Sequence, residues 1–404
     1  MIFIKNLLSR KKIAINVLLA SSLLLTLGRG LTLPFMAIYL SRQYDMSVKD
    51  VGVALTIALV SGVLFSLWFG ILSDRVDKKK CLLIAIAIFL SGFIAIPLMD
   101  NAILVVICYS IINCSYIVFS VVQKGYLSET VSVALKPKIF SINYTVINIG
   151  WTIGPPLGTF AVMYSTSLPF YLSALIALAP MVLIGRYVKQ SAPEVQLNDS
   201  GDRVYLSPRV MLKDKPLMWF TFSAFLGTLV YGAFSSCISQ YMILASDAAM
   251  AEKVVSVVLS VNALVVVICQ YSVGKVINRE NIREMMGLGT VFFILGFAGF
   301  MMSGSNLWLW GLSSAVFTLG EIIYAPGEFM LVDGIAPAGL KASYFAAQQL
   351  GWLGGALNPL FTGLVLTALP PYMLFVLMMV GICLAYLAII LGMRSLSRHG
   401  MVPG

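Results

Sequence analysis

Long apolar runs separated by short polar turns cover almost the whole chain. Each run has about twenty residues or more, enough for a helix to cross a bilayer core of about 30 Å. The pattern predicts twelve membrane helices, over residues 13–40, 48–72, 80–99, 102–124, 139–163, 168–188, 216–244, 252–274, 284–303, 306–332, 341–367 and 370–392. A polar stretch, 189–215, follows the sixth helix. We therefore expect an all-α membrane protein with two six-helix halves, 1–188 and 216–404, joined by a cytoplasmic linker.

One short turn, between the second and third runs, recurs in the second half. Residues 70–80 read Gly-Ile-Leu-Ser-Asp-Arg-Val-Asp-Lys-Lys-Lys. The Gly-x-x-x-Asp-Arg spacing at its start returns at 274–279 as Gly-Lys-Val-Ile-Asn-Arg, about half a chain length later. A turn that recurs at half the chain length indicates two copies of one structural unit. The lysines of the first turn mark the cytoplasmic side of the membrane.

The composition excludes an ordinary soluble domain. Hydrophobic residues make up 59% of the 404-residue chain and charged residues only 11%, whereas charged residues reach about 25% in soluble proteins. The net charge of +10 could indicate a nucleic-acid partner. However, all cationic residues except Arg29, Arg42, Lys49 and Lys253 fall in segments that this topology places in the cytoplasm. This is positive-inside bias, so we expect no nucleic-acid partner and both termini in the cytoplasm.

The start of the chain has two interpretations. A basic leader, 1–12, precedes the first apolar run, and this order is also typical of a signal peptide. The run over 13–40 is too long for the apolar region of a signal peptide, which has about 7–15 residues. We therefore expect an uncleaved first membrane helix.

Residues that carry enzyme or metal chemistry are scarce. His399 is the only histidine, and the six cysteines have no close CxxC spacing. The chain contains neither a GxSxG sequence nor a P-loop. We therefore expect no metal site, no cofactor and no enzymatic activity.

Three charged residues fall well inside apolar runs. Arg29 lies near the centre of the first run, between Gly28 and Gly30. Glu321 lies near the centre of the tenth run, and Glu328 follows two turns later on the same helix face. A charge at this depth costs several kcal/mol unless it is paired or hydrated, and its default interpretation is functional. We expect Arg29 to bind substrate and both glutamates to couple protons. The alternatives are a structural ion pair for Arg29 and an interfacial position for Glu328.

The recurring turn also resembles a family signature. Its residues that resemble the loop 2–3 signature of the major facilitator superfamily (MFS) are Gly70, Leu72, Asp74, Arg75, Lys78 and Lys79. The chain departs from the signature at Asp77, where the family usually has glycine. The resemblance implies the MFS fold, with twelve helices in two pseudo-symmetric halves around a central cavity.

The same resemblance implies a cytoplasmic latch that holds one access state. Its expected members are Gly70, Asp74, Arg75, Lys78 and Glu129. In the family, the aspartate meets the start of helix 11, where this chain offers Lys341-Ala-Ser343. The lysine would pair with an acid at the end of helix 4, for which Glu129 is the candidate.

The fifth run carries a second resemblance. Gly150, Gly154, Pro155 and Gly158 resemble the GxxxGPxxG signature of MFS antiporters, which marks exporters. The glycines permit close helix packing and the proline kinks the helix, so packing alone is the alternative interpretation. Many MFS proton antiporters carry an arginine in helix 4, which this chain lacks. We expect Arg29 to take that cationic role.

Polar residues inside the runs complete the expected substrate site. Family architecture places helices 1, 4, 7 and 10 around the cavity, which would bring Arg29 and Glu321 to opposite walls. The residues expected to contact substrate are Arg29, Asn113, Tyr116, Asn143, Tyr144, Gln240, Tyr324 and Gln348. Hydrogen bonding between helices is the alternative role for the uncharged members.

These features predict a secondary active transporter of the bacterial inner membrane, a monomer whose partners are a small-molecule substrate, protons and the lipid bilayer. We expect proton-coupled efflux of small amphipathic metabolites by alternating access. A resemblance to one bacterial exporter of the family implies dipeptides, whose carboxylate and ammonium groups suit an arginine and a glutamate. The alternatives are a multidrug exporter, favoured by the aromatic residues, and a sugar exporter, favoured by asparagine and glutamine. A receptor is disfavoured because the chain has no sensor domain outside the membrane.

Overall fold

The computed structural model describes residues 2–46, 48–190, 213–232, 234–245 and 248–398, and within these ranges the chain forms helices and no strands. The α-helices are α1 (Ile2–Tyr44), α2 (Val48–Ser73), α3 (Lys78–Ala95), α4 (Ala102–Thr130), α5 (Lys136–Val162), α6 (Leu168–Tyr187), α8 (Lys215–Tyr231), α9 (Phe234–Ala245), α10 (Ala248–Val276), α11 (Ile282–Met302), α12 (Leu307–Ile335), α13 (Lys341–Gln348), α14 (Leu353–Ala368) and α15 (Met373–Arg398). Short 3-10 helices are η1 (Ile96–Leu98), η2 (Val133–Leu135) and η3 (Gln349–Trp352). Most of the predicted linker, 191–212, lies outside the described residues.

Among the described residues, ten helical segments are long and apolar enough to cross a membrane. The remaining two predicted spans correspond to α5 and to the pair α8 and α9. α5 is less apolar because it begins with Lys136 and contains Pro155 and Pro156. α8 has only 17 residues, from Lys215 to Tyr231, so it falls just short of the length needed to be counted as a membrane span by itself. The prediction of an all-α membrane fold with twelve spans is confirmed.

Two helices that the pattern predicts as continuous are interrupted. The predicted helix 216–244 divides after Tyr231, and the predicted helix 341–367 contains the 3-10 helix η3. The hydroxyl of Thr228 on α8 donates a 2.5 Å hydrogen bond to the carbonyl of Gly351 in η3. The Thr228 hydroxyl thus supplies the hydrogen bond that the buried Gly351 carbonyl needs where the α-helix gives way to a 3-10 helix. Lys341–Ala368 still forms one membrane-crossing segment, as predicted. The pattern of apolar residues carries no information on the contact with Thr228, so the 3-10 turn inside that segment was not predicted.

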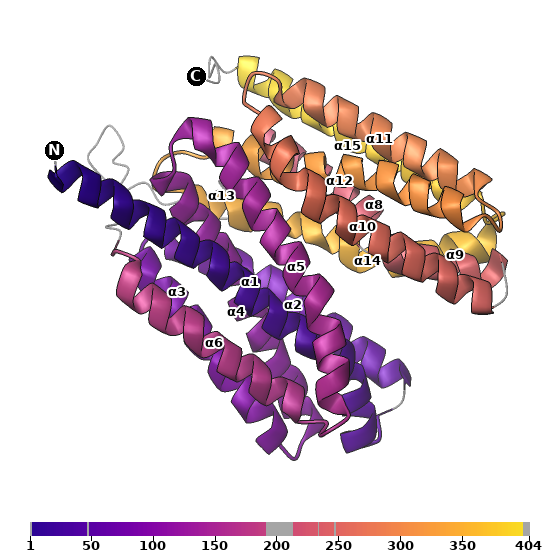
Figure 1. The fold of residues 1–404 in the computed structure, drawn as a ribbon, viewed down its shortest axis with the longest axis horizontal. Helices are drawn as coiled ribbons and strands as arrows, with labels where there is room; N and C mark the ends of the chain where they lie inside the picture. The colour runs from indigo at the N-terminus through magenta and orange to yellow at the C-terminus, as the bar shows by residue number, and fades with distance from the viewer. Residues whose placement is uncertain (1, 47, 191–212, 233, 246–247, 399–404) are drawn as a thin grey trace. The chain divides into compact units, whose positions relative to one another are not determined.

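The chain divides into two compact units, each described here by itself. Unit 1 comprises Met1–Val133, Val146–Ser207 and Pro337–Ala346. In it, α1 packs on α6, and α4 packs on both α2 and α3 (Figure 1). The short segment Pro337–Ala346, late in the sequence, therefore belongs with helices from the first third of the chain.

Unit 2 comprises Ala134–Thr145, Pro208–Ala336 and Ala347–Gly404. In it, α12 packs against α10 and α11, while α8 packs against α14 and α15. Aromatic rings from α11 and α12 form the interior, with the centroids of Phe293 and Phe297 at 4.9 and 5.3 Å from that of Phe317. Gly296 allows this close approach, because a Cβ there would lie 2.9 Å from the Cα of Phe317.

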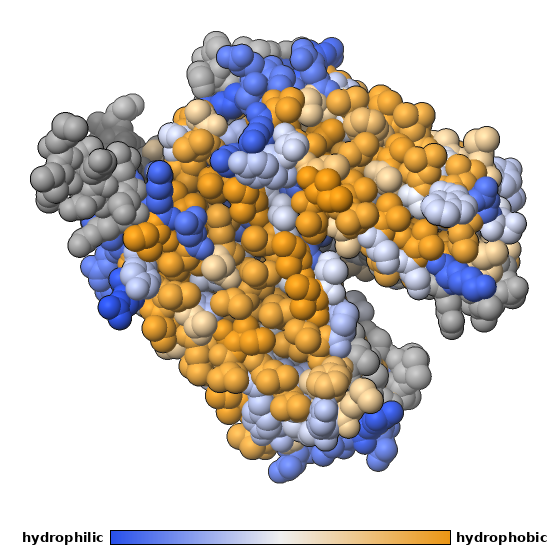
Figure 2. Space-filling view, in the orientation of Figure 1, coloured by the Kyte–Doolittle hydropathy of each residue, from blue (hydrophilic) through white to orange (hydrophobic). Residues whose placement is uncertain are grey.

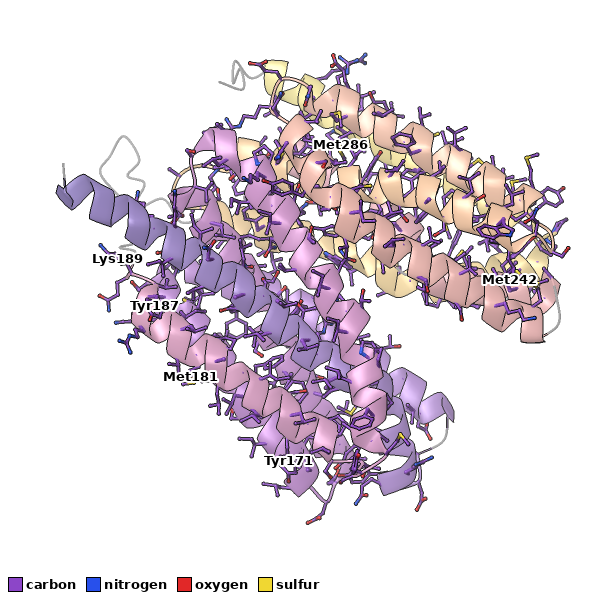
Figure 3. The ribbon with its side chains drawn as sticks, viewed as in Figure 1. Tyr171, Met181, Tyr187, Lys189, Met242 and Met286 are labelled. Atoms are coloured by element: carbon purple, nitrogen blue, oxygen red, sulfur yellow. The ribbon has the colours of Figure 1, made fainter. Side chains whose placement is uncertain are left out.

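The outer surface is apolar, as lipid contact requires. Large apolar side chains gather over much of the face in Figure 2. In the described chain as a whole, Trp68 and Leu360 are among the large apolar side chains that are more than half exposed. In water such a surface would promote association, whereas in a bilayer it meets acyl chains. Tyr171 and Tyr187 lie near opposite ends of α6, with Lys189 beyond the second (Figure 3). This arrangement matches the aromatic and cationic anchors of a membrane helix at its two interfaces.

The close contact between α14 and α8 yields a stability prediction. A Cβ at Gly354 would overlap the carbonyl oxygen of Phe225. We expect Gly354→Ala to lower the free energy of unfolding by about 1–3 kcal/mol, because overpacking forces the two helices apart. Thermal unfolding of the purified protein in detergent measures the change.

The matched control is Gly185→Ala on α6, where a Cβ would meet nothing within 4 Å. This variant should keep or raise stability, by up to about 1 kcal/mol, through higher helix propensity. Equal thermal midpoints for the two variants would show that the contact between α14 and α8 is not tight.

Candidate functional site

Arg29 lies on α1 between two aromatic rings. Its guanidinium carbon is 4.7 Å from the ring centroid of Tyr116 on α4 and 5.5 Å from that of Trp151 on α5. Its buried Nε atom donates no hydrogen bond, and no carboxylate among the described residues of unit 1 pairs with it. Each cation–π contact contributes about 0.5–2 kcal/mol, which offsets only part of the cost of a charge in apolar surroundings. The arrangement can therefore receive an anionic group.

One face of α4 lines the surroundings of Arg29. Tyr109, Asn113 and Tyr116 follow i, i+4, i+7 spacing and therefore share a helix face. Tyr116 exchanges a 2.8 Å hydrogen bond with Thr26 on α1, which holds its ring beside Arg29. The amide nitrogen of Asn113 donates to the carbonyl of Tyr109 at 3.0 Å, and its side-chain oxygen accepts no hydrogen bond. Tyr109, which the sequence predictions did not include, is buried and interacts electrostatically with Arg29.

The predicted antiporter signature forms the contact between α5 and α1. A Cβ at Gly154 would lie 2.7 Å from the Cα of Gly30, and one at Gly150 would lie 2.9 Å from Thr26. A Cβ at Gly158 would overlap the carbonyl of Leu31. The two backbones can touch only because these positions lack side chains. This contact also brings Trp151, which follows Gly150, beside Arg29.

Pro155 and Pro156 lie inside α5, next to this contact. The ring of Pro155 is itself part of the contact, because its Cδ would lie 3.4 Å from a Cβ at Gly30. A proline removes one backbone hydrogen bond of the helix.

Glu321 on α12 is buried and held by two neutral donors. The hydroxyl of Tyr144 donates to its Oε1 at 2.5 Å, and the amide of Asn262 donates to its Oε2 at 2.7 Å. Tyr144 was predicted to contact substrate, and the structure brings it to this carboxylate. Asn262 was not among the predicted site residues. Its place on the α10 face toward α12 is the signal that could have identified it.

Glu328 has separate neighbours from Glu321. The hydroxyl of Tyr231, on α8, donates to its Oε2 at 3.1 Å. Gly227, one turn earlier on α8, makes room for the carboxylate, because a Cβ there would lie 2.8 Å from Oε1. Glu328 is 5% exposed, so its side chain lies inside unit 2 rather than at its surface.

The other predicted substrate residues occupy varied positions. Tyr324 is fully buried in unit 2, where its hydroxyl exchanges a 2.7 Å hydrogen bond with Thr290. Asn143 is buried on α5, and Gln348 is buried at the end of α13. Gln240 is half-buried on α9, beside Gly363 of α14.

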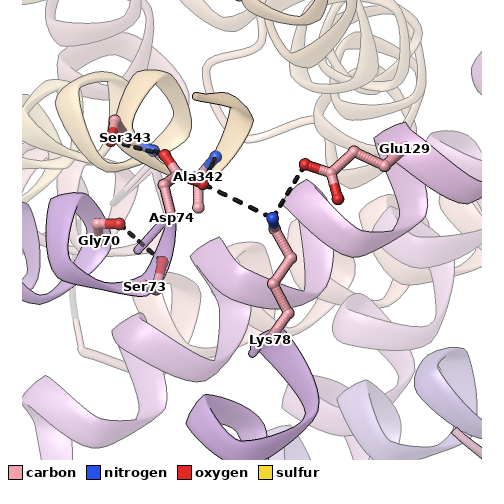
Figure 4. A network of polar contacts seen from close by, with 7 residues as sticks. All are labelled: Gly70, Ser73, Asp74, Lys78, Glu129, Ala342 and Ser343. Atoms are coloured by element: carbon pink, nitrogen blue, oxygen red, sulfur yellow. Dashed lines mark hydrogen bonds and ion pairs between the residues drawn. The ribbon is translucent and has the colours of Figure 1, made fainter. Parts of the chain in front are cut away.

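Asp74 joins the turn after α2 to the start of α13 within unit 1 (Figure 4). Its carboxylate accepts hydrogen bonds from the backbone amides of Ala342 at 3.2 Å and Ser343 at 2.7 Å, and from the Ser343 hydroxyl at 2.6 Å. A helix N-terminus carries partial positive charge and unpaired amides, so it is a suitable partner for a carboxylate. Gly70 lets α2 approach here, because a Cβ would meet Ala342 and Ala346.

Lys78 extends this network to α4. Its Nζ atom lies 2.9 Å from Glu129 and 3.8 Å from Asp74, and the lysine is almost completely buried. Arg75, the remaining predicted member, is exposed. Burial raises the pKa of Asp74 to about 6, although the Ser343 hydrogen bonds and Lys78 act in the opposite direction.

A second ion-pair network lies in unit 2. Lys136 at the start of α5 donates to both carboxylate oxygens of Asp333 at 3.0 and 2.8 Å, and Arg279 lies 3.5 Å from the same carboxylate. Asp333 is 2% exposed, so this network is buried. The recurring turn that ends in Arg279 is the signal that could have identified this network, because it predicts a partner at the end of α12.

Two related units of long apolar helices, with charges held in small polar networks, define a multi-pass membrane protein of the transporter class. The family model described as Major Facilitator Superfamily matches residues 18–359. The chain belongs to this superfamily of membrane transporters, as its turn and fifth-helix signatures indicate.

Similar proteins agree with this assignment. The chain is 56% identical to the uncharacterized MFS-type transporter YdeE of Escherichia coli K12, over 94% of this chain and 95% of that protein. It is 20% identical to a Na(+), Li(+), K(+)/H(+) antiporter of Planococcus maritimus, over 85% and 87%. It is 24% identical to the quinolone resistance protein NorA of Staphylococcus aureus, over 87% and 86%. Among solved structures, the MFS transporter FucP in the outward conformation shares the fold, with a TM-score of 0.75 at 14% identity over 95% and 99%.

The raised pKa of Asp74 predicts a pH dependence. Between pH about 4 and about 6, the folded chain retains a proton on Asp74 that the unfolded chain releases. The folded state therefore binds more protons, and the free energy of unfolding should fall as pH rises, by roughly 2–3 kcal/mol across the window. Asp74→Asn should remove this part of the slope in thermal unfolding between pH 4 and 7. Ser343→Ala should extend the window to higher pH. A slope unchanged in Asp74→Asn would contradict the assignment.

The Asp333 network predicts non-additive effects of mutation. Asp333→Leu leaves Lys136 buried without its carboxylate, so we expect a loss of about 3–5 kcal/mol in the free energy of unfolding. Lys136→Met combined with Asp333→Leu should cost less than Asp333→Leu alone, because no buried charge remains uncompensated. Thermal unfolding of the single and double variants measures the coupling. Strictly additive losses would show that the pair is not coupled.

Proposed function

We propose that this MFS transporter exports small amphipathic metabolites that carry an anionic group, in exchange for protons, with dipeptides as the preferred class. The observation that supports this most strongly is Arg29, a half-buried arginine that lies between two aromatic rings and has no carboxylate partner among the described residues of unit 1. The guanidinium group can bind a carboxylate through two parallel hydrogen bonds. An anionic cargo would supply the countercharge that unit 1 does not.

Glu321 is the proposed carrier of the coupling proton. Burial disfavours its ionised form, while hydrogen bonds from Tyr144 and Asn262 favour it. Both donors are neutral, and among the described residues of unit 2 no cation forms an ion pair with this carboxylate. Opposing influences of this kind make both protonation states accessible, as a proton carrier requires. Glu328, with Tyr231 as its donor, is the second candidate.

The direction of transport is inferred from the fifth helix and from relatives. The resemblance of Gly150, Gly154, Pro155 and Gly158 to the antiporter signature supports export. Relatives named as a cation/proton antiporter and as a quinolone resistance protein support antiport and efflux. Alternating access is the mechanism proposed, with Asp74, Lys78 and Glu129 stabilising one of its states. We place the chain in a bacterial inner membrane, as a monomer with both termini in the cytoplasm.

Dipeptides fit the charges available. A dipeptide carries a free carboxylate, for which Arg29 of unit 1 is the proposed partner. The second candidate function is multidrug efflux. The aromatic rings of Tyr116 and Trp151 support it, because they could stack on planar apolar drugs.

The first test compares dipeptides with their C-terminal amides in proteoliposomes under an imposed pH gradient. Wild-type flux of the dipeptide should exceed that of the amide at least about tenfold, because only the free carboxylate pairs with Arg29. Arg29→Met should remove this preference. Arg42→Met, on the exposed end of the same helix, is the matched control and should keep it. Flux of lipophilic cations alone, insensitive to Arg29, would replace dipeptide export with multidrug efflux.

The second test concerns the coupling proton. Glu321→Gln keeps the side-chain shape but cannot release a proton, so the pH gradient should no longer drive accumulation while dipeptide exchange persists. Glu328→Gln is the comparison variant. Coupling that survives Glu321→Gln and fails in Glu328→Gln would move the role to Glu328.

A further inference from the structure

Two lysines converge on one exposed tyrosine of unit 2. The Nζ atom of Lys275 lies 4.2 Å from the ring centroid of Tyr271, one turn earlier on α10. The Nζ atom of Lys138, at the start of α5, lies 5.1 Å from the same centroid. Tyr271 is 42% exposed. Two like charges held this close repel each other, so an anion that interacts with both lysines at once would lower that repulsion.

The carboxylate of Asp333 is already paired with other cations. Asp333 accepts hydrogen bonds from Lys136, two residues before Lys138, and lies within ion-pair distance of Arg279. Within the described part of unit 2, neither Lys138 nor Lys275 forms an ion pair. The pair of lysines thus carries positive charge that the protein does not neutralise.

The two helices are held together at this point by a glycine. A Cβ at Gly274 would overlap the side chain of Ser141, so α10 and α5 can approach only because Gly274 lacks a side chain. Lys275 is the next residue on α10, and Lys138 lies one turn before Ser141 on α5. The packing of α10 on α5 therefore sets the backbone positions from which the two lysine side chains extend.

An apolar stripe continues from these cations along α10. Leu264, Ile268 and Tyr271 follow i, i+4, i+7 spacing, so they lie on the same face of α10. Ile268 is 63% exposed and Leu264 is 58% exposed. The membrane-crossing segment of α10 runs Lys253–Val276, which puts the lysine pair at its end and the stripe in its interior. The clustering of cations at this end marks it as the cytoplasmic side.

We propose that Lys138, Tyr271 and Lys275 form a binding site for the phosphate headgroup of an anionic phospholipid, with one acyl chain along Leu264 and Ile268. The two ammonium groups neutralise the phosphodiester, and the tyrosine hydroxyl can donate a hydrogen bond to it. The apolar stripe selects a lipid over a free phosphate ion. The bound headgroup bridges α5 and α10 beside the Lys136–Asp333 pair. This site is independent of the cargo proposed above.

The test uses the full-length protein in detergent, titrated with phosphatidylglycerol or phosphatidylcholine and examined by native mass spectrometry. Wild type should retain phosphatidylglycerol in preference to phosphatidylcholine. The Lys138→Gln/Lys275→Gln double variant should bind phosphatidylglycerol at least about tenfold more weakly, since each basic residue near an anionic surface contributes about 1 kcal/mol. Unchanged binding in the double variant would overturn the proposal.

The matched control is Lys80→Gln/Lys253→Gln, which removes the same charge from two exposed positions away from the site. It should bind phosphatidylglycerol like wild type, and an equal loss in both double variants would reduce the effect to net charge. Competition with inorganic phosphate or glycerol phosphate distinguishes binding of the phosphate group alone from binding of the whole lipid. If either displaces the lipid at millimolar concentration, the site binds phosphate and the lipid assignment is wrong. Ile268→Asn should weaken lipid retention while leaving both lysines in place.

Discussion

A charge in apolar surroundings must be compensated, and this constraint explains most of what distinguishes the chain from a bundle of apolar helices. Glu321 receives hydrogen bonds from a tyrosine and an asparagine. Asp74 receives them from a helix start, and Asp333 lies between two cations. Arg29 differs from these carboxylates, because the described residues of unit 1 give it aromatic faces but no countercharge. The incompletely compensated group is thus an arginine, and for this reason the cargo is proposed to be anionic.

Each of the two recurring turns contributes one charged residue to a polar network, but the two residues have opposite charges. In unit 1, the turn supplies the carboxylate, Asp74, and the start of α13 supplies backbone amides. In unit 2, the turn supplies a cation, Arg279, and the start of α5 supplies a second, Lys136, to a carboxylate at the end of α12. The spacing of the turn is repeated, but the network uses the aspartate position, Asp74, in the first turn and the arginine position, Arg279, in the second. The repeat therefore preserves the position of a polar network and not its residues.

How far the sequence predicts this structure depends on the range of the interactions. Apolar length predicts the helices, because crossing a bilayer is a property of one segment. The interruption at Gly351 depends on a hydroxyl from α8, so no local pattern reveals it. Arg29 and Glu321 were identifiable because charge inside an apolar run is visible in the sequence. Tyr109 and Asn262 were missed because their importance comes from what lies opposite them in space.

The continuity of α5 has a mechanical consequence. Tyr144 donates to Glu321, and Gly154, ten residues later on the same helix, touches the backbone of Gly30 next to Arg29. The contact at Gly154 is backbone against backbone, so no flexible side chain can absorb a displacement. Within unit 1, any shift of α5 at Gly154 must therefore move the backbone of α1 beside Arg29 and, with it, the ring of Trp151 that covers the guanidinium group.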